Sequence, residues 1–471
     1  MTNSKWLRSA LLGGVAVSVM ATGAQASELS DLKAQLEALQ SRVNTIETAP
    51  VLPAGVSAMT MSKGHGSNAS WGNESARDAI NTNSTRGYTI SINPTADLPA
   101  PVTEITVYGY AKLDFTFGSE TGGGVLLNMG GDDSYHGADE SNEWAASAVQ
   151  TRFGIKAKTD TAIGQIRSTI EGDFYGASGV LRARHAFGEW DMTPNWTLVA
   201  GQTWHTASLL PIGVSTIDFS GSAGLTYARS AQLSLAYKNG PITGLIGISA
   251  PIQGGADYPD IGGRLQYTAS GGHELIVAAS IGDDDLAAVA AAGPTAGPDG
   301  LDGTADDTLA TPAAGSRSGT SWQVSGGANI RLGDMATITT GAIYGKGSQA
   351  ARYLNQDGFA NRDAAGNLTT MWGANIGVSM SVSEATTFNA EFGYSDQKES
   401  LGSTGGTGCA AAATSSSAGC VTDVMTAHAN IMWRPVKQMR LGWEVQWGRN
   451  DYYVAKSNNV VKGHFGAWFF F

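Results

Sequence analysis

The fold of this chain is decided by its stretch Val460-Val461-Lys462-Gly463-His464-Phe465-Gly466-Ala467-Trp468-Phe469-Phe470-Phe471. Side chains alternate between the two faces of an extended strand. One face of this stretch is apolar, and its members are Phe471, Phe469, Ala467, Phe465, Gly463 and Val461. The other face carries Lys462 and His464. The pattern predicts the closing strand of a transmembrane β-barrel, whose strand edges must all be paired because lipid excludes water. The alternative is a buried strand of a soluble β-sandwich.

The composition fits many strands joined by turns. Glycine is abundant, with 62 residues, whereas Asp, Glu, Lys and Arg together make up only 15% of the chain. After the N-terminal apolar run there is no stretch of about eighteen apolar residues, which excludes a helical membrane protein. The formal net charge of -12 argues against a nucleic-acid partner, because phosphate binding requires a concentrated basic surface.

Residues 1–26 have the pattern of a secretory signal peptide. Lys5 and Arg8 precede an apolar run, and Ala24-Gln25-Ala26 provides a small-residue cleavage site. A transmembrane anchor is the alternative, but the apolar run is too short for one. We therefore expect the mature chain to begin near Ser27.

Residues 27–49 have a helical period and form a predicted coiled coil. The apolar residues alternate spacings of three and four, and they are Leu29, Leu32, Leu36, Leu39, Val43 and Ile46. So short a helix is marginal in isolation, so we expect it to oligomerise as part of a larger assembly. An amphipathic helix lying on a surface is the alternative. The Gly-, Ser- and Asn-rich residues 50–103 that follow read as a flexible linker, with a plug-like piece around Trp71 as one option.

From residue 104 to residue 471 the hydrophobic period changes to two. In the first segment Leu113 and Phe117 face one way and Lys112 and Asp114 the other. Similar segments recur at about residues 149–158, 163–174, 181–190, 196–204, 228–238, 242–250, 260–269, 274–282, 320–331, 336–346, 369–381, 386–395, 422–433, 439–449 and 460–471. This predicts an all-β, up-and-down transmembrane barrel of about sixteen antiparallel strands, an even number as in bacterial barrels.

The connections between these segments alternate in length. Turns such as 239–241 and 332–334 are short, whereas stretches such as 205–227, 283–318 and 348–367 are long. Outer-membrane barrels have short periplasmic turns and longer external loops, while a soluble sandwich has no reason to keep its short turns on one side.

Four stretches resemble the DcaP-like family of outer-membrane porins. They are Thr151-Arg152-Phe153-Gly154-Ile155-Lys156-Ala157-Lys158-Thr159, Ile170-Glu171-Gly172-Asp173-Phe174-Tyr175-Gly176, Leu181-Arg182-Ala183-Arg184-His185-Ala186-Phe187-Gly188-Glu189 and Ala200-Gly201-Gln202-Thr203-Trp204, followed by Asp218-Phe219-Ser220-Gly221. The resemblance implies a homotrimer of sixteen-stranded barrels in the bacterial outer membrane, with a helical N-terminal bundle in the periplasm. It also implies passage of small, preferentially anionic solutes. The terminal Phe471 is similar to the assembly signal of outer-membrane proteins. The Ala/Gly/Asp-rich loop 283–318 departs from the family.

Basic residues share the predicted inner face of three neighbouring strands. This basic ladder consists of Arg152, Lys156, Arg167, Arg182 and Arg184. Its positive potential would raise the local concentration of anions, and arginine pairs well with carboxylates, which favours a pathway for solutes such as dicarboxylates. Glu171 and Asp173 lie on the same face, so the alternative is a set of ion pairs that stabilises the wall.

The loop from His205 to Leu225 is a predicted constriction. In trimeric porins the loop at this place folds inward, and Leu209-Leu210-Pro211 and Asp218-Phe219 are too apolar for a free external loop. A loop that covers a neighbouring protomer is the alternative.

Further candidate sites lie in the other long loops. Cys409 and Cys420 would form a disulfide in an oxidising compartment, with two free thiols as the alternative. A second group could bind calcium but lacks the spacing of a calcium-binding loop, so a solvated acidic loop is the alternative; it comprises Asp299, Asp302, Asp306 and Asp307.

No catalytic motif or cofactor site is recognised, so we do not expect an enzyme. The prediction is a porin. A structural outer-membrane anchor or adhesin with a plugged barrel is the alternative function.

Overall fold

A computed structural model describes the part of the chain that forms the barrel. The described residues are 58–63, 88–93, 103–119, 142–209, 212–252, 256–285, 319–354, 359, 361–362, 367–397, 421–452 and 457–471. The predicted signal peptide, the coiled coil with its six apolar positions, most of the linker and Leu210 lie outside these residues. So do the two cysteines and the four aspartates considered as a calcium site.

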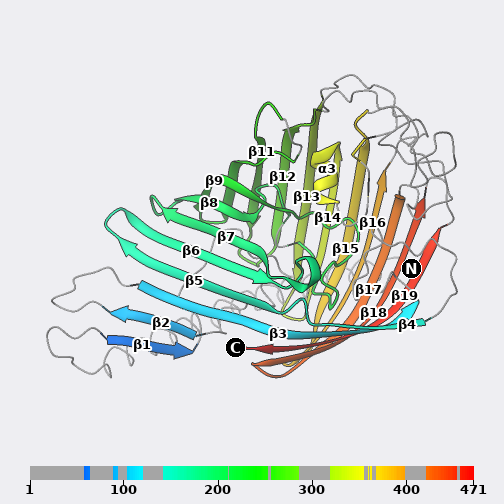
Figure 1. The fold of residues 1–471 in the computed structure, drawn as a ribbon, viewed down its shortest axis with the longest axis horizontal. Coiled ribbons are helices and arrows are strands. Elements are labelled where there is room, and N and C mark those ends of the chain that lie inside the picture. The colour runs from blue at the N-terminus through cyan, green and yellow to red at the C-terminus, as the bar shows by residue number, and fades with distance from the viewer. Residues whose placement is uncertain are drawn as a thin grey trace, which may run out of the picture. The chain divides into compact units, whose positions relative to one another are not determined.

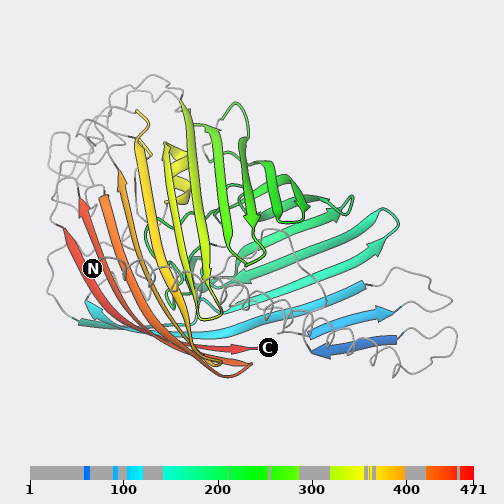
Figure 2. The ribbon, with the colours of Figure 1, turned by 180° about the vertical axis from the view of Figure 1, so that it is seen from behind.

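Sixteen strands form a closed antiparallel barrel, so the barrel part of the predicted fold class is confirmed, while its coiled coil lies outside the described residues (Figure 1). The strands are β3 Thr103–Ser119, β5 Arg152–Thr161, β6 Gly164–Asp173, β7 Arg182–Asp191, β8 Trp196–Trp204, β9 Arg229–Asn239, β10 Ile242–Ser249, β11 Asp260–Thr268, β12 Glu274–Asp283, β13 Thr320–Leu332, β14 Ala336–Lys346, β15 Thr370–Ser383, β16 Thr386–Gln397, β17 Val421–Val436, β18 Met439–Tyr452 and β19 Asn458–Phe470. Each pairs with the next along the chain, as the ordered colours of Figures 1 and 2 show. The ring closes where β19 pairs with β3, with Phe465 opposite Phe115.

Three shorter strands extend this sheet. β4 (Asn142–Ser147) pairs with residues 114–119 of β3, beyond the part of β3 that pairs with β5. β2 (Tyr88–Asn93) pairs with residues 103–107 of β3, beyond the part that pairs with β19. β1 (Ala58–Lys63) pairs with β2. Two strands therefore fall within the stretch expected to be flexible linker, and β2 satisfies backbone groups at an edge of β3 that β19 does not reach.

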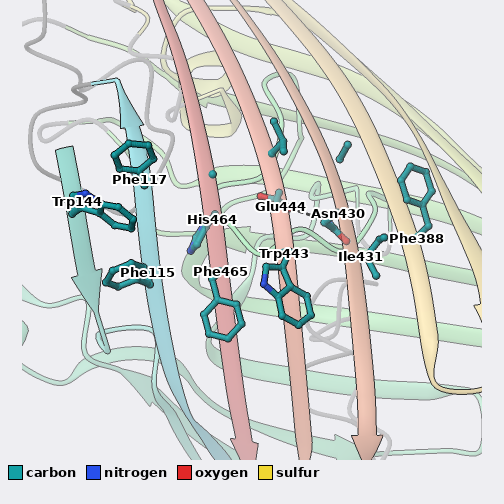
Figure 3. Close-up of a pocket in the computed structure, with 13 residues that line it drawn as sticks. Phe115, Phe117, Trp144, Phe388, Asn430, Ile431, Trp443, Glu444, His464 and Phe465 are labelled. Carbon is teal, nitrogen blue, oxygen red and sulfur yellow. Dashed lines mark hydrogen bonds between the residues drawn. The ribbon is translucent and has the colours of Figure 1, made fainter. Parts of the chain in front are cut away.

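The wall alternates between apolar side chains outside and polar side chains inside. On β18, Trp443 and Val445 are 51% and 62% exposed on the outer face, while Glu444 between them is buried on the inner face. Figure 3 shows Trp443 and Phe465 on the opposite side of their strands from Glu444 and His464. The period of two in the sequence follows from this division between two environments.

The connections alternate as expected. β9 and β10 are joined through Gly240, and β13 and β14 through Gly333; the positive φ angles of 54° and 62° favour glycine in these tight turns. At the other end of the barrel the connections are longer, such as residues 205–228 between β8 and β9. None of the helices among the described residues is both long and apolar enough to cross a membrane.

Candidate functional site

The connection between β8 and β9, residues 205–228, folds into the barrel and is called the inward loop below. Its described residues are 205–209 and 212–228. Ala207, Leu209, Ile212, Val214 and Ile217 are each at most 3% exposed. Such burial is expected of apolar side chains packed against a wall, not of a free external loop.

A row of glycines on the inner wall makes room for this loop. The glycine track consists of Gly327 on β13, Gly341 on β14, Gly377 on β15, Gly442 on β18 and Gly466 on β19. A Cβ atom added to Gly442 or Gly466 would lie 2.7 Å from the side chain of Ile217, and one added to Gly377 would lie 2.7 Å from that of Val214. Atoms this close overlap, so these wall positions need glycine beneath the loop.

The tip of the inward loop is fastened to β18 and β3. The Glu444 carboxylate accepts hydrogen bonds from the backbone N–H groups of Ile217 at 2.8 Å and Asp218 at 3.2 Å. It also accepts from the side-chain amides of Asn430 at 2.8 Å and Gln446 at 2.9 Å. A buried carboxylate is tolerated when several donors surround it in this way.

Lys112 on β3 holds the same turn of the loop by a hydrogen bond to a backbone carbonyl of the loop. Its ammonium group donates to the Ile217 carbonyl oxygen at 2.8 Å and forms an ion pair with Asp114 at 2.6 Å. Lys112 also lies 4.5 Å above the ring of Trp468, and the Arg440 guanidinium lies 3.9 Å from that ring. Both cations therefore lie close to one aromatic ring of the inner wall.

Three members of the basic ladder lie beside the two carboxylates. Arg184 contacts Glu171 at 2.9 Å and Asp173 at 3.0 Å, Arg182 contacts Asp173 at 2.8 Å, and Arg152 contacts Glu171 at 3.4 Å. We call these five residues the arginine cluster. A register shift between Glu171 and Gly172 in the pairing of β6 with β7 brings the cluster together at this level.

The other two members of the ladder are Arg167 and Lys156. Arg167 pairs with Glu189 at 3.3 Å and with Asp191. The Lys156 ammonium lies 5.2 Å from the ring of Tyr108, and the Tyr108 hydroxyl donates to Glu171 of the arginine cluster at 2.9 Å. Arg167 therefore has carboxylate partners of its own, whereas Lys156 is linked to the cluster through Tyr108.

Phe219 joins the inward loop to the arginine cluster. Its ring stacks on Tyr175 with the centroids 5.0 Å apart, and the guanidinium groups of Arg184 and Arg182 lie 5.1 Å and 6.0 Å from it. Asp218 is buried, and one of its carboxylate oxygens accepts the Ser220 N–H at 2.7 Å. The loop tip therefore contacts β18 through Glu444 and β7 through the arginines.

The predicted assembly residue Phe471 lies at the outer surface. The residue is 44% exposed, and its backbone N–H donates to the Gly109 carbonyl of β3 at 3.2 Å. The last residue thus extends the pairing of β19 with β3.

Sequence reasoning missed Glu444 and Lys112 as holders of the loop. Both lie on polar faces that the period of two reveals, with Glu444 following Arg440 and Gly442 at alternate positions of β18. The alternation of polar and apolar residues shows that these side chains face the lumen, but it does not identify which loop they contact.

One group of carboxylates could hold a metal ion. Ligand oxygens of Asp257, Asp283 and Asp285 lie within 4.8 Å of one another among the described residues. Asp283 already accepts the Asp257 N–H and Asp285 the Gly319 N–H. Nothing else at this place indicates a cation, so we assign no metal site.

Two solved structures similar to this one are outer-membrane proteins. The crystal structure of the outer membrane channel DcaP of Acinetobacter baumannii matches with a TM-score of 0.61 at 18% identity, over 78% of this chain and 97% of that chain. The trimer form of in-vitro folded OmpT, an outer membrane protein of Vibrio cholerae, matches with a TM-score of 0.51 at 11% identity, over 78% of this chain and 99% of that chain. No protein-family model and no curated protein matches the sequence. The structural likeness confirms the resemblance to DcaP at the level of the fold.

Proposed function

We propose that this protein is an outer-membrane porin, through which small hydrophilic solutes diffuse. The observation that carries the proposal is a closed barrel, apolar outside and polar inside, in which the inward loop lies in the glycine track and narrows the lumen. The loop is held by hydrogen bonds at its tip and by packing against the inner wall, so the opening of the pore has a fixed size. A pore that selects solutes by size requires this property.

The outer face supports a place in the lipid bilayer. Aromatic side chains pair at the end of the barrel that carries the long loops, with ring centroids 5.7 Å apart for Trp322 and Tyr344 and 5.0 Å apart for Trp372 and Tyr394. Trp and Tyr rings of outer-membrane barrels gather at the membrane interfaces. We place the barrel in the bacterial outer membrane and the N-terminal coil in the periplasm.

We also propose a homotrimer. The predicted coiled coil at residues 27–49 would join the chains, and the similar Vibrio cholerae structure is a trimer form of OmpT.

The preference for anions, including dicarboxylates, rests on the charge of the arginine cluster. The cluster has three guanidinium groups and two carboxylates, so its own formal charge is positive. A positive field in a narrow, low-dielectric pore enriches anions and repels cations.

Single-channel recording across a salt gradient tests both parts of the proposal. We expect discrete conductance steps and a reversal potential displaced toward that of the anion. A reversal potential displaced toward the cation would refute the anion preference, and the absence of any conductance would refute the pore.

A structural anchor with a plugged barrel remains the second candidate function. It is favoured by one observation, the helix α3 (Ser348–Tyr353), because this second segment also lies inside the barrel. Absence of conductance in the same recordings would favour the anchor.

A further inference from the structure

The connection between β14 and β15 also folds inward. Its helix α3 has Ser348, Gln349, Ala350 and Tyr353 buried, and it contacts strands β12 to β15 (Figure 1). Gly347 precedes the helix with φ at +69°, a conformation that lets the chain turn inward directly after β14. The sequence predicted only a long external connection here, so the inward helix is a difference from that expectation.

The helix and the inward loop share one apolar core inside the barrel. The loop contributes Ala207, Leu209 and Ile212, and the α3 segment contributes Ala350, Tyr353 and Leu354. The inner wall completes the core with Ile276, Ala278, Ile343 and Met371. Apolar residues on an inner barrel wall otherwise face water. This packing removes the apolar side chains of the loop, of α3 and of the wall from water together, which is stabilising.

A polar contact joins the two segments at the start of the loop. The Tyr353 hydroxyl contacts Nδ1 of His205, and the two rings meet edge to face with centroids 5.7 Å apart. Nδ1 of His205 also accepts the Ala207 N–H at 3.2 Å, while its Nε2 lies 2.9 Å from the Ser249 hydroxyl. These contacts define a neutral imidazole whose Nε2–H donates to Ser249.

Two aspartates of the wall fasten α3 in turn. Asp260 at the start of β11 forms an ion pair with Arg352 at 3.2 Å. Asp284, directly after β12, accepts the backbone N–H of Ser348 at 2.7 Å and pairs with Arg362 at 3.2 Å. Both pairs are largely buried, so they are only weakly screened by salt.

We propose that α3 is a strut that holds the root of the inward loop, residues 205–209, against the wall, and that Tyr353 is its positioning residue. The tip of the loop is held separately by Glu444 and Lys112. The strut thus fixes the part of the constriction that the tip contacts do not reach. The inference deepens the proposed pore function and rests on it for its effect on conductance.

The test uses the full-length protein with Tyr353→Phe, which removes one hydroxyl and keeps the packing. Loss of one hydrogen bond should make release of the loop root about fivefold more frequent. We expect brief partial closures to become about fivefold more frequent in single-channel recordings, with the main conductance step unchanged. Tyr344→Phe is the matched control, because Tyr344 is on the same hairpin but points outward and is 47% exposed.

Hydrogen exchange of the loop amides provides a second measurement that needs no conductance. The Ser208 N–H donates to the His205 carbonyl at 2.9 Å and the Leu209 N–H to the Thr226 carbonyl at 2.9 Å. Exchange at these two amides should be about fivefold faster in Tyr353→Phe, while exchange at Ile217 stays unchanged.

The outcomes separate the two proposals. If the parent protein does not conduct, the pore function fails, and hydrogen exchange alone then decides the strut. If exchange at Ser208 and Leu209 is the same in Tyr353→Phe, Tyr344→Phe and the parent, the strut is refuted whether or not the barrel conducts. Faster exchange at the root with an unaltered tip supports it.

Discussion

The carboxylate of Glu444 accepts the backbone N–H of Ile217 at 2.8 Å, across 227 residues of sequence. This contact ties the tip of the inward loop to β18, on the inner wall beside the β19–β3 closure of the barrel. Because Glu444 also accepts the Asp218 N–H, one carboxylate fixes two consecutive peptide groups. The loop is therefore held through its backbone, and its side chains are left to pack in the glycine track.

Glu444→Gln should release the loop tip while leaving the barrel closed. The amide keeps the size of the side chain but replaces one accepting oxygen by a donor that faces backbone N–H groups. We expect a loss of about 2 kcal/mol, the scale of a hydrogen bond to a charged group, and up to about 30-fold faster hydrogen exchange at Ile217 and Asp218. Glu274→Gln is the control, since Glu274 accepts from Gln266 and Asn329 at the short-turn end of β12. Unchanged protection of Ile217 would show that Glu444 does not hold the tip.

Gly466→Ala should displace the loop toward the lumen. The new methyl group would lie 2.7 Å from both Ile217 and Trp468, and overpacking of this kind costs about 1–3 kcal/mol. A displaced loop narrows the pore, so the single-channel conductance should fall. Gly463→Ala on the same strand is the control, because its added methyl group would meet nothing closer than 3.7 Å. Equal conductance in the two variants would contradict the role of the glycine track.

The barrel was predictable from sequence because its physical cause acts locally. Each strand divides lipid from lumen, so Trp443 and Glu444 must alternate wherever the strand lies in the ring. The inward position of the loop was also readable, since Leu209 and Phe219 are apolar within a connection between strands. The partners of this loop were not readable, because the Glu444 contact depends on how the loop crosses strands that are distant in sequence.

The glycine track, helix α3 and the partners of the arginines could not be predicted from the sequence either. Gly442 and Gly466 are informative only once their inner-face position beneath Ile217 is known, and glycine is common throughout this chain. Helix α3 has six residues, too few for a helical period to appear in the sequence. The sequence left the pairing of Arg184 with Glu171 or with solutes open, because strand parity gives the face of a side chain but not its partner.

Acid should loosen the loop root through His205, which lies in the inward loop outside the strands. Burial, and to a lesser degree the charge of Arg352, lower the pKa of His205 to about 3. Nδ1 of the imidazole already accepts the Ala207 N–H. Protonation of Nδ1 would bring its own N–H toward the Ala207 N–H, and two donors repel each other. The neutral form is therefore the one that fits between Tyr353 and Ser249.

The direction of the pH effect follows from this lowered pKa. A released loop root exposes an imidazole with a pKa of about 6.5, so it binds more protons than the seated root between about pH 3 and pH 6.5. Stability of the seated root is constant above about pH 6.5 and falls as the pH decreases below it. Release should be more than about tenfold more frequent at pH 5 than at pH 7, measured as closures in single-channel recordings. His205→Gln should remove this step; a variant that keeps it would assign the titration to another group.

Arg182→Gln combined with Arg184→Gln distinguishes a selective pathway from a set of wall supports. The change leaves Arg152 alone against Glu171 and Asp173, so the cluster becomes net negative, and we expect the reversal potential to move toward the cation. The shift should fade at high salt, because the screening length is about 10 Å at 0.1 M. Thermal stability should also fall, since removing one partner strands buried carboxylates at a cost of about 3–5 kcal/mol. The control adds Glu171→Gln and Asp173→Asn, which restores the net positive charge and should return the reversal potential to that of the parent. A lower melting temperature with an unmoved reversal potential would mean that the arginines only support the wall.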